Sequence, residues 1–366
     1  MGYHRDSDHY PSITPFEGEM RRRLWYNAYT FDILTSFQLG LPGIVLSLEC
    51  DTKRPSNLLD DDFGPDTTVL PPSRPLSEIS PVTFTIVKSK LSMVFARAAG
   101  ISHAVREPSY TEVMEIDEQL TQVYNDFPPA MQFTSMTQSL ADSPSLIFNR
   151  FKIELLYRKT RCVLHRRYLT EKLSDPRFEQ SRKICVDAAM QLLRHHGSIY
   201  EASQGSGPLS STRWFMSSLN AHDFLLGAMV LCLELNLLEK CPMKSDAPGK
   251  PSAAKVEEIK ALLRRSYDIY KLPVRHYAHT AKALKVMELI LDKSHGLQDA
   301  AAEAGREGDV AGVAPSSLDA NLAQPLEFLS IDQTTAAPMV PSIDMGEMAP
   351  IGDMFNQGID WVSSRL

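Results

Sequence analysis

The sequence predicts an all-α fold: an irregular multi-helix domain with a long ordered loop after its first helix and a disordered, acidic C-terminal tail. No stretch shows the sustained alternation of apolar and polar residues that is typical of a half-buried strand. Ser, Thr or Asp followed by Pro, a frequent start of a helix, recurs along the chain. The domain organisation that follows is a helical body over residues 1–295 and a tail over residues 296–366.

The first helix is predicted from its two ends. Thr14 can act as the N-cap, Pro15 suits the first helical position, and Glu17 stands where a capping box needs it. Gly40 is of a residue type that often ends a helix. We therefore expect a helix from Pro15 to about Gly40.

Helical periodicity predicts a half-buried, amphipathic first helix. At 100° per residue, one narrow stripe is formed by Leu24, Ala28, Phe31 and Thr35. Trp25 and Asp32 lie together on its flank, and we expect them to be buried together with Asp32 paired to an arginine. Glu17 and Glu19 each precede an arginine by four residues, which is the favourable order for an ion pair.

N-cap residues, prolines and glycines predict where the other helices begin and end. Their expected starts are Ser80-Pro81, Ser109, Ser143-Pro144 and Asp175-Pro176, and further helices are expected near residues 224–238, 253–271 and 274–294. The helix that begins near Asp175 is expected to stop at Gly197. His195 and His196 would then lie at the negative end of its dipole, in a structural role.

The charge is unevenly distributed along a chain of ordinary globular composition. Hydrophobic residues make up 43% and charged residues 23% of the 366. Residues 296–366 hold 11 acidic and 2 basic side chains, a charge of −9, so the total of −7 leaves +2 for residues 1–295. A nearly neutral body argues against a broad nucleic-acid-binding surface, whereas an acidic tail is typical of a solvated interaction segment.

Cysteine spacing and apolar runs argue against two further classes. Five cysteines, none in a C-x-x-C pair, indicate neither a disulfide framework nor a structural zinc site and fit a reducing intracellular compartment. The longest apolar run, residues 224–233, is far shorter than the roughly 20 residues needed to span a bilayer. We therefore expect no membrane partner.

No motif predicts catalysis. The EF-hand pattern after Asp60 fails at three positions, and there is no P-loop, dinucleotide fingerprint or nucleophile elbow. His276 and His279 could approach one metal on a helix, but no carboxylate or cysteine stands in a recognised spacing with them. We expect no enzyme, and we predict no catalytic, cofactor-binding or metal-ligating residue and no cofactor in this chain.

Two blocks near the N-terminus resemble a known family. The first block, within residues 3–42, contains His4, Arg5, Asp6, Glu19, Arg21, Arg22, Arg23, Trp25, Asp32, Gly40 and Pro42. The second is a polar loop with a proline–asparagine pair, an aspartate run and a Pro-Arg-Pro turn, and it contains Pro55, Asn57 and Asp60. Together they resemble the fungal-specific transcription factor domain, the helical regulatory region of zinc binuclear cluster activators. The resemblance implies a structural role for these residues.

The same resemblance implies a transcriptional regulator of the nucleus. In the family, sequence-specific DNA and zinc binding reside in a six-cysteine cluster, which is absent from this chain. DNA would then be reached only through a missing or separate zinc cluster. The family's helical domain begins well before the position of His4, so the resemblance also implies an N-terminally incomplete body that exposes apolar surface and is either marginally stable or self-associating.

The last half of the tail interleaves acids with bulky apolar groups. The apolar groups close to acids are Phe328, Leu329, Phe355, Ile359 and Trp361. This pattern is typical of amphipathic activation segments, whose apolar groups are taken up by a partner groove. We expect these residues to contact a coactivator or another part of the transcription machinery, although the pattern also suits a tail that docks on its own body.

Two other functions stay open on the sequence alone. One is a partner without DNA-binding activity that forms a homo- or heterodimer with a full-length relative, or inhibits it, through the helical body. The other is a helical enzyme or a binder of small molecules.

Overall fold

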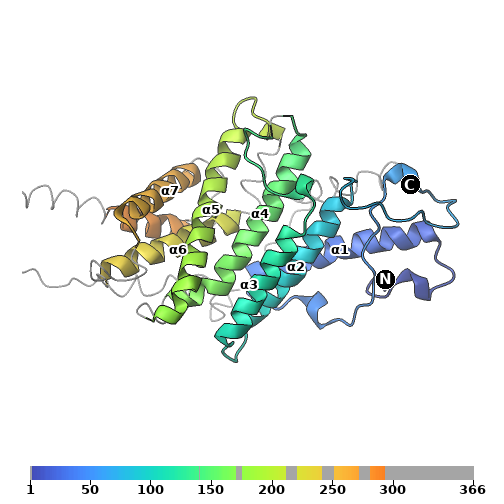
Figure 1. The fold of residues 1–366 in the computed structure, drawn as a ribbon, viewed down its shortest axis with the longest axis horizontal. Coiled ribbons are helices and arrows are strands. Elements are labelled where there is room, and N and C mark those ends of the chain that lie inside the picture. The colour runs from blue at the N-terminus through green and yellow to red at the C-terminus, as the bar shows by residue number, and fades with distance from the viewer. Residues whose placement is uncertain are drawn as a thin grey trace, which may run out of the picture.

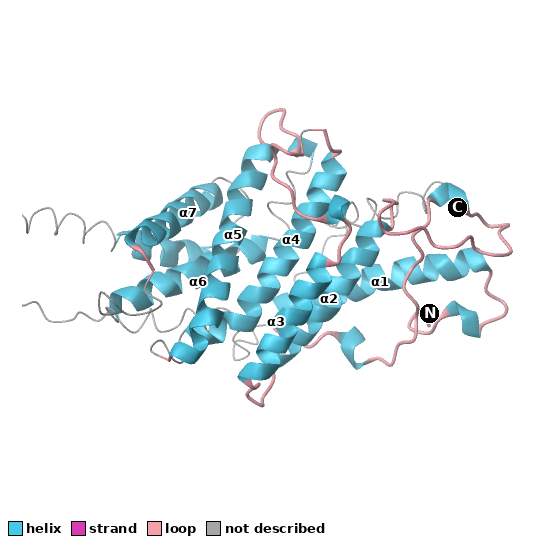
Figure 2. Cartoon of the chain, viewed as in Figure 1, coloured by secondary structure: helices cyan, strands magenta, loops and turns pink. Residues whose placement is uncertain are grey.

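The computed structural model describes residues 2–139, 141–169, 175–211, 221–240, 251–271 and 281–292, and these residues form helices and loops without a strand (Figure 2). The all-α prediction is confirmed. The α-helices are α1 (Pro15–Gln38), α2 (Thr83–Ser102), α3 (Tyr110–Asn125), α4 (Pro144–His165), α5 (Glu179–Ser203), α6 (Ala221–Lys240) and α7 (Ala253–Lys271), followed by a helical stretch over residues 281–292.

The helices pack on one another largely in chain order. α1 packs on α2, α2 packs on α3 and α4, α4 packs on α5, and α5 packs on both α6 and α7. In Figure 1, α2, α4 and α5 lie through the middle of the molecule, α1 extends to one side with the N-terminal loops, and α6 and α7 lie on the other. The loop that follows α1 is therefore at one end of the body.

A single hydrophobic core joins these helices. α4 contributes many buried side chains to it, and Phe151 and Leu155 are almost completely inaccessible. α6 is long and apolar enough to cross a membrane, but 78% of its apolar window, residues 221–239, is buried inside the fold. α6 is therefore placed as a core helix of a globular domain.

The helix starts predicted at Thr14, Ser109 and Ser143 agree with the caps in the structure. The other two starts differ, because α2 begins at Thr83 and Asp175 caps the short helix η6 (Pro176–Phe178) that precedes α5. The Thr14 hydroxyl accepts from the Glu17 amide at 3.2 Å, and the Glu17 carboxylate accepts from the Thr14 amide at 3.2 Å, which completes the capping box. Ser109 caps α3 and Ser143 caps α4 in the same way, by accepting an amide three residues on. Local side-chain chemistry thus fixes where these helices begin.

The prediction that α5 stops at Gly197 is wrong, because the helix continues to Ser203. Gly197 lies on the side of α5 that faces α7, where a Cβ atom would collide with the Arg265 guanidinium. The glycine therefore serves close packing and not helix termination. His195 and His196 consequently lie inside the helix and not at the end of its dipole, and both are buried.

The predicted faces of α1 are also wrong. Leu24 and Phe31 of the predicted stripe are exposed, whereas the buried side carries several charged residues. Trp25 is buried as expected, but Asp32 is only half-buried and accepts the Val45 amide at 3.0 Å in place of an arginine. The loop after α1 covers the polar side of the helix, and the apolar stripe faces solvent.

Three sequence-based expectations lie outside the described residues. They are the disordered tail over residues 296–366 with its candidate activation contacts, the pair His276 and His279, and the first part of the helix expected over residues 274–294.

Gly227 of α6 tests the packing of α5 on α6. A Cβ atom there would lie 3.1 Å from the Leu192 Cβ and 3.2 Å from the Ala189 carbonyl oxygen. Gly227→Val should lower the free energy of unfolding by about 1–3 kcal/mol, because the added side chain pushes two core helices apart. Urea unfolding, followed by circular dichroism, measures this change in the free energy of unfolding.

The matched control is Gly100→Ala near the end of α2, where an added Cβ meets nothing within 4 Å. Relief of the backbone entropy cost of glycine should leave the control as stable as the parent or stabilise it by about 0.5–1 kcal/mol. Equal effects at the two glycines would contradict the close contact of α5 with α6.

Candidate functional site

The predicted signature residues meet at the N-terminal end of the molecule, where α1 contacts its following loop. We call Asp6, Glu19, Arg22, Arg23 and Asn57, with the groups they bind, the N-terminal network. All five residues are buried, although four of them are charged. Buried charges are stable only when they are paired and hydrogen-bonded. The partners of each therefore show what the network does.

Asp6 is the first centre of the network. Its carboxylate binds Arg22 through two hydrogen bonds, of 2.9 Å from Nε and 2.6 Å from Nη2, and it accepts the Lys53 amide at 2.7 Å. Burial alone would raise the pKa of Asp6, but Arg22 and the amides of Lys53 and Asp8 outweigh it and hold the pKa far below its usual range. Asp6 therefore stays ionised and joins the N-terminal segment to both α1 and the loop.

Glu19 is the second centre, and its side chain is inaccessible to solvent. Its two carboxylate oxygens accept the Ser56 amide at 3.1 and 3.2 Å, and Oε1 also accepts Arg23 Nε at 3.2 Å. Burial outweighs these bonds and raises the pKa of Glu19 above its usual value. The predicted pair of Glu19 with Arg23 is confirmed, and its main additional partner is the loop backbone.

Arg23 carries the network into the aspartate run. Its guanidinium donates to Asp60 Oδ1 at 2.8 Å and to the Leu58 carbonyl at 3.2 Å, and it lies 5.0 Å from the centre of the Phe63 ring. Asp62, in the same run, pairs with Arg74 at 2.7 Å. The aspartates thus hold the loop to α1 and to its own Pro-Arg-Pro turn.

Asn57 organises the last part of the loop, and 1% of its surface is exposed. Its amide nitrogen donates to the carbonyl groups of Pro75 and Glu78, at 2.9 and 2.8 Å. Its amide oxygen accepts the hydroxyl groups of Ser80 and Thr83, at 2.7 and 2.8 Å. One asparagine therefore fixes the turn that leads into α2.

The remaining signature residues surround this network. His4 packs against Trp25, Arg5 pairs with Asp51 at 3.2 Å, and Arg21 lies over the Tyr3 ring. Gly40 has a φ of 68°, which a glycine adopts without strain, and it follows α1 as predicted. Pro42 and Pro55 lie in the loop, where Pro55 is buried next to the Ser56 amide. Asp32 binds the loop through the Val45 amide.

This arrangement is suited to holding a loop and not to performing a reaction. The carboxylates of the N-terminal network are neutralised by guanidinium groups and amides of α1 and the loop. Among the residues that the structure describes, no group of three or more His, Cys, Asp or Glu side chains is placed to hold a metal ion.

Comparison with known proteins matches the segment that contains the network. Residues 1–125 match the fungal specific transcription factor domain, from the N-terminal loop through α3. Over this segment the chain is similar to members of this family. This domain occurs in transcription factors and not in enzymes. The matched residues include the whole N-terminal network.

Several curated relatives carry the similarity beyond this segment. A zinc-cluster transcription factor of Monascus ruber, pigI, is 35% identical over 98% of this chain and 46% of its own length. The factor mpsB of Macrophomina phaseolina is 35% identical over 80% of this chain and 40% of its own. The equisetin cluster transcription factor of Fusarium heterosporum is 34% identical over 83% of this chain and 43% of its own.

The chain thus spans less than half the length of these relatives. No solved structure matches it.

Deeper in the helical body, mostly beyond the residues that match the family domain, the sequence did not predict a second set of buried polar contacts. Lys159 of α4 pairs with Asp223 of α6 at 2.7 Å, and Arg182 of α5 pairs with Glu234 of α6 at 2.8 Å. Glu154 of α4 contacts Tyr124, Arg158 and His195. The available signal was a charged residue on an otherwise apolar helix face, but it did not indicate the partner.

Burial and neighbouring side chains shift the pKa values of Glu154 and His196. Burial would raise the pKa of Glu154, but His195, Arg158 and Tyr124 lower it to about 2. Burial and then Arg265 lower the pKa of His196 to about 3, so its ring is neutral at physiological pH. Both groups lie within packed side chains, so we assign them to the structure of the body.

Asn57→Ala tests the turn that leads into α2. It leaves two buried hydroxyl groups and two carbonyl groups without their partner, and it should lower the free energy of unfolding by about 2–4 kcal/mol. Chemical unfolding measures the loss. Asn27→Ala is the matched control, because Asn27 makes one bond to its own helix, at 3.0 Å, and should cost less than about 1 kcal/mol. Similar losses would contradict the organising role of Asn57.

Asp6→Asn tests the ion pair with Arg22 through its pH dependence. A depressed pKa contributes stability that is complete above the unfolded-state pKa of about 3.9 and is lost as the pH falls towards the folded-state pKa. The variant should be less stable than the parent at pH 7, and this difference should narrow between about pH 5 and pH 2. Asp61→Asn, at an exposed acid, is the control. A difference that is constant across this range would refute the pairing.

Proposed function

We propose that this chain is the regulatory and activation portion of a fungal zinc-cluster transcription factor that acts in the nucleus. The observation that carries the proposal is the match of residues 1–125 to the family domain, centred on a network that has structural and not catalytic geometry. The acidic tail supplies the activating part in this proposal. Its aromatic and aliphatic groups would be taken up by a coactivator or another component of the transcription machinery.

The relatives favour a narrower role. Two relatives, the equisetin factor described above and a further one of 34% identity, are named as the equisetin and pyrrolocin cluster transcription factors. We infer that this chain likewise controls a set of linked genes. The five cysteines of the chain do not form the six-cysteine cluster of the family, so in this proposal DNA contact comes through a zinc cluster outside these 366 residues.

The exposed side of α1 favours a second role, as a dimerisation partner. Leu24 and Phe31 on the helix, and Leu39, Leu41 and Ile44 just after it, are exposed. An apolar patch of this kind on a soluble domain often marks an interface. Self-association or pairing with a full-length relative through α1 would then accompany the regulatory role.

A reporter assay tests the activating role. The full chain is fused to a foreign DNA-binding domain whose site lies upstream of a reporter gene in a fungal nucleus. We expect activation, and we expect Phe355→Ala/Ile359→Ala/Trp361→Ala to reduce it at least roughly tenfold, because such apolar anchors dominate binding energy.

The control for the reporter assay changes the same number of apolar residues where acids and aromatic groups are not interleaved. Val310→Ala/Val313→Ala/Leu318→Ala should leave activation near that of the parent. A fusion that occupies the promoter without activating the reporter would reject the activating role, and equal losses in the two triple variants would reject the assigned contacts.

A further inference from the structure

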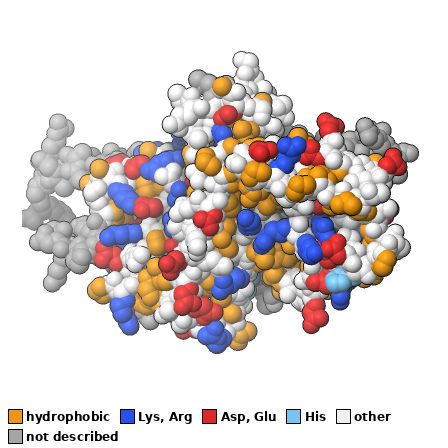
Figure 3. All heavy atoms as spheres, turned by 45° about the vertical axis from the view of Figure 1, so that its right-hand side comes forward, with side chains coloured by type: hydrophobic (Ala, Val, Ile, Leu, Met, Phe, Trp, Pro, Cys, Tyr) orange, Lys and Arg blue, Asp and Glu red, His pale blue; other side chains and the backbone are white. Residues whose placement is uncertain are grey.

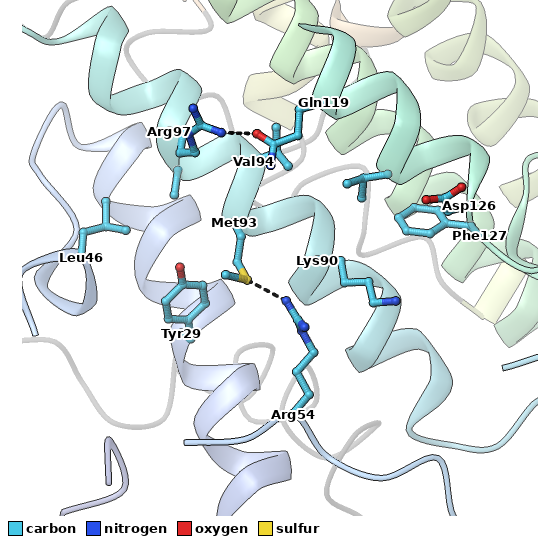
Figure 4. Close-up of a pocket in the computed structure, with 12 residues that line it drawn as sticks. Tyr29, Leu46, Arg54, Lys90, Met93, Val94, Arg97, Gln119, Asp126 and Phe127 are labelled. Atoms are coloured by element: carbon cyan, nitrogen blue, oxygen red, sulfur yellow. Dashed lines mark hydrogen bonds between the residues drawn. The ribbon is translucent and has the colours of Figure 1, made fainter. Parts of the chain in front are cut away.

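An open groove with a volume of about 510 Å³ lies where α1, the short helix η2 (Ile44–Ser47), α2 and α3 meet (Figure 4). Its apolar lining includes Tyr29, Met93 and Phe127, and the Met93 side chain is 39% exposed. Figure 3 shows a face of the molecule where hydrophobic side chains gather, with lysine and arginine side chains among them. The groove therefore presents apolar surface to solvent.

Three cationic side chains line the same groove: Arg54 from the loop, and Lys90 and Arg97 from α2. Within the described part of the chain, none of the three forms an ion pair with a carboxylate. Arg54 donates to the Met93 sulfur at 3.2 Å, and Arg97 donates to Gln119 (Figure 4). Asp126 is the one acid among the described residues of the lining, so the groove carries a charge of about +2.

These properties select an acidic and apolar occupant. Unpaired cations around an apolar surface attract a ligand whose carboxylates reach the cations while its apolar groups leave water. Nucleic acid is disfavoured, because three cations and an aspartate on an apolar lining offer little to a phosphate backbone.

One segment of this chain has the required chemistry. Residues 344–361 contain four acids, Asp344, Glu347, Asp353 and Asp360, and no basic residue. The same segment contains Phe355, Ile359 and Trp361. It thus combines negative charge with aromatic and aliphatic groups within 18 residues.

The covalent connection allows this segment to reach the groove. Residues 293–343 separate it from the last described helical stretch, and at about 3.3 Å per residue they span up to roughly 170 Å. A domain of this size has a radius of gyration of about 19 Å. Because the two partners share one chain, an effective concentration in the millimolar range makes even weak docking sufficient.

We propose that the groove between α1, α2 and α3 binds residues 344–361 of the same chain. The carboxylates face Lys90, Arg97 and Arg54, and the aromatic groups pack on Met93 and its apolar neighbours. Docking is reversible, so it lowers the fraction of molecules whose aromatic groups another protein can bind, and it reduces activation by the full chain without abolishing it. That last consequence rests on the proposed function of the tail, whereas docking itself does not.

A peptide titration on the full-length chain tests the proposal. The probe is a fluorescein-labelled peptide of residues 344–361, and the full chain carries Phe355→Ala/Ile359→Ala/Trp361→Ala so that its own tail competes weakly. Fluorescence anisotropy should show saturable binding that weakens as salt is added. The parent chain should bind the peptide less tightly than the triple variant does, because its own tail occupies the groove.

Charge reversal identifies the site. Lys90→Glu/Arg97→Glu in the same background should weaken peptide binding at least roughly tenfold, because two attractions become repulsions. A peptide with Asp353→Lys/Asp360→Lys should bind this reversed groove better than the parental peptide does. Lys183→Glu, at an exposed lysine of α5 that pairs with Glu179, should leave the affinity unchanged. Thermal unfolding confirms that each variant is folded.

Three results would overturn the proposal. The first is a peptide affinity that Lys90→Glu/Arg97→Glu leaves unchanged, and the second is equal binding of a scrambled peptide of the same composition. The third is self-association of the chain that Lys90→Glu/Arg97→Glu abolishes, because the occupant of the groove would then be a second copy of the chain. Because the titration measures no transcription, its failure leaves the reporter result intact. A silent reporter likewise leaves the docking result intact.

Discussion

The burial of charge on one side of α1 is the constraint on which the N-terminal half of this protein depends. Glu19, Arg22 and Arg23 are removed from water, and each would destabilise the fold by several kcal/mol without a partner. Their partners come from the preceding segment and the following loop, which have little regular structure of their own. The path of the loop is therefore determined by where these side chains need hydrogen bonds.

This network also shapes the surface around it. The Lys53 amide binds Asp6 and the Ser56 amide binds Glu19, so the backbone on both sides of Arg54 is fixed by buried carboxylates. Arg54 is thereby held at the edge of the groove next to Met93. The rest of the body is stabilised in another way, because α4, α5 and α6 are joined mainly by apolar packing, with a few buried ion pairs between them.

Features that depend on neighbouring residues were predictable from the sequence. The capping box of α1 and the caps of α3 and α4 follow from local spacing and were found as expected. The inner side of α1 was not predictable in this way, because periodicity assumes that the apolar side is buried. Here the loop partner of Glu19, the Ser56 amide, is 37 residues away, and no local rule indicates such a contact.

The same limit explains the other differences. Gly197 looks like a helix end until Arg265, from another helix, is seen against it. Asp32 was expected to bind an arginine, but the loop brings the Val45 amide nearer. The signature residues could be named from the sequence, whereas their partners, Ser56, Lys53 and the carbonyl groups around Asn57, depend on tertiary structure.

Support of the loop by side chains has a consequence for how this region fluctuates. A sheet or helix frays one backbone bond at a time. Here the Ser56 amide binds Glu19, and the carbonyl groups of Pro75 and Glu78 and the Ser80 hydroxyl all bind the side chain of the adjacent residue, Asn57. Loss of the Asn57 contacts therefore frees several groups of residues 75–83 at the same moment, and loss of Glu19 frees the amide next to Asn57. Residues 53–83 are therefore expected to open and close together, as one unit of local unfolding, and not to peel away progressively from α2.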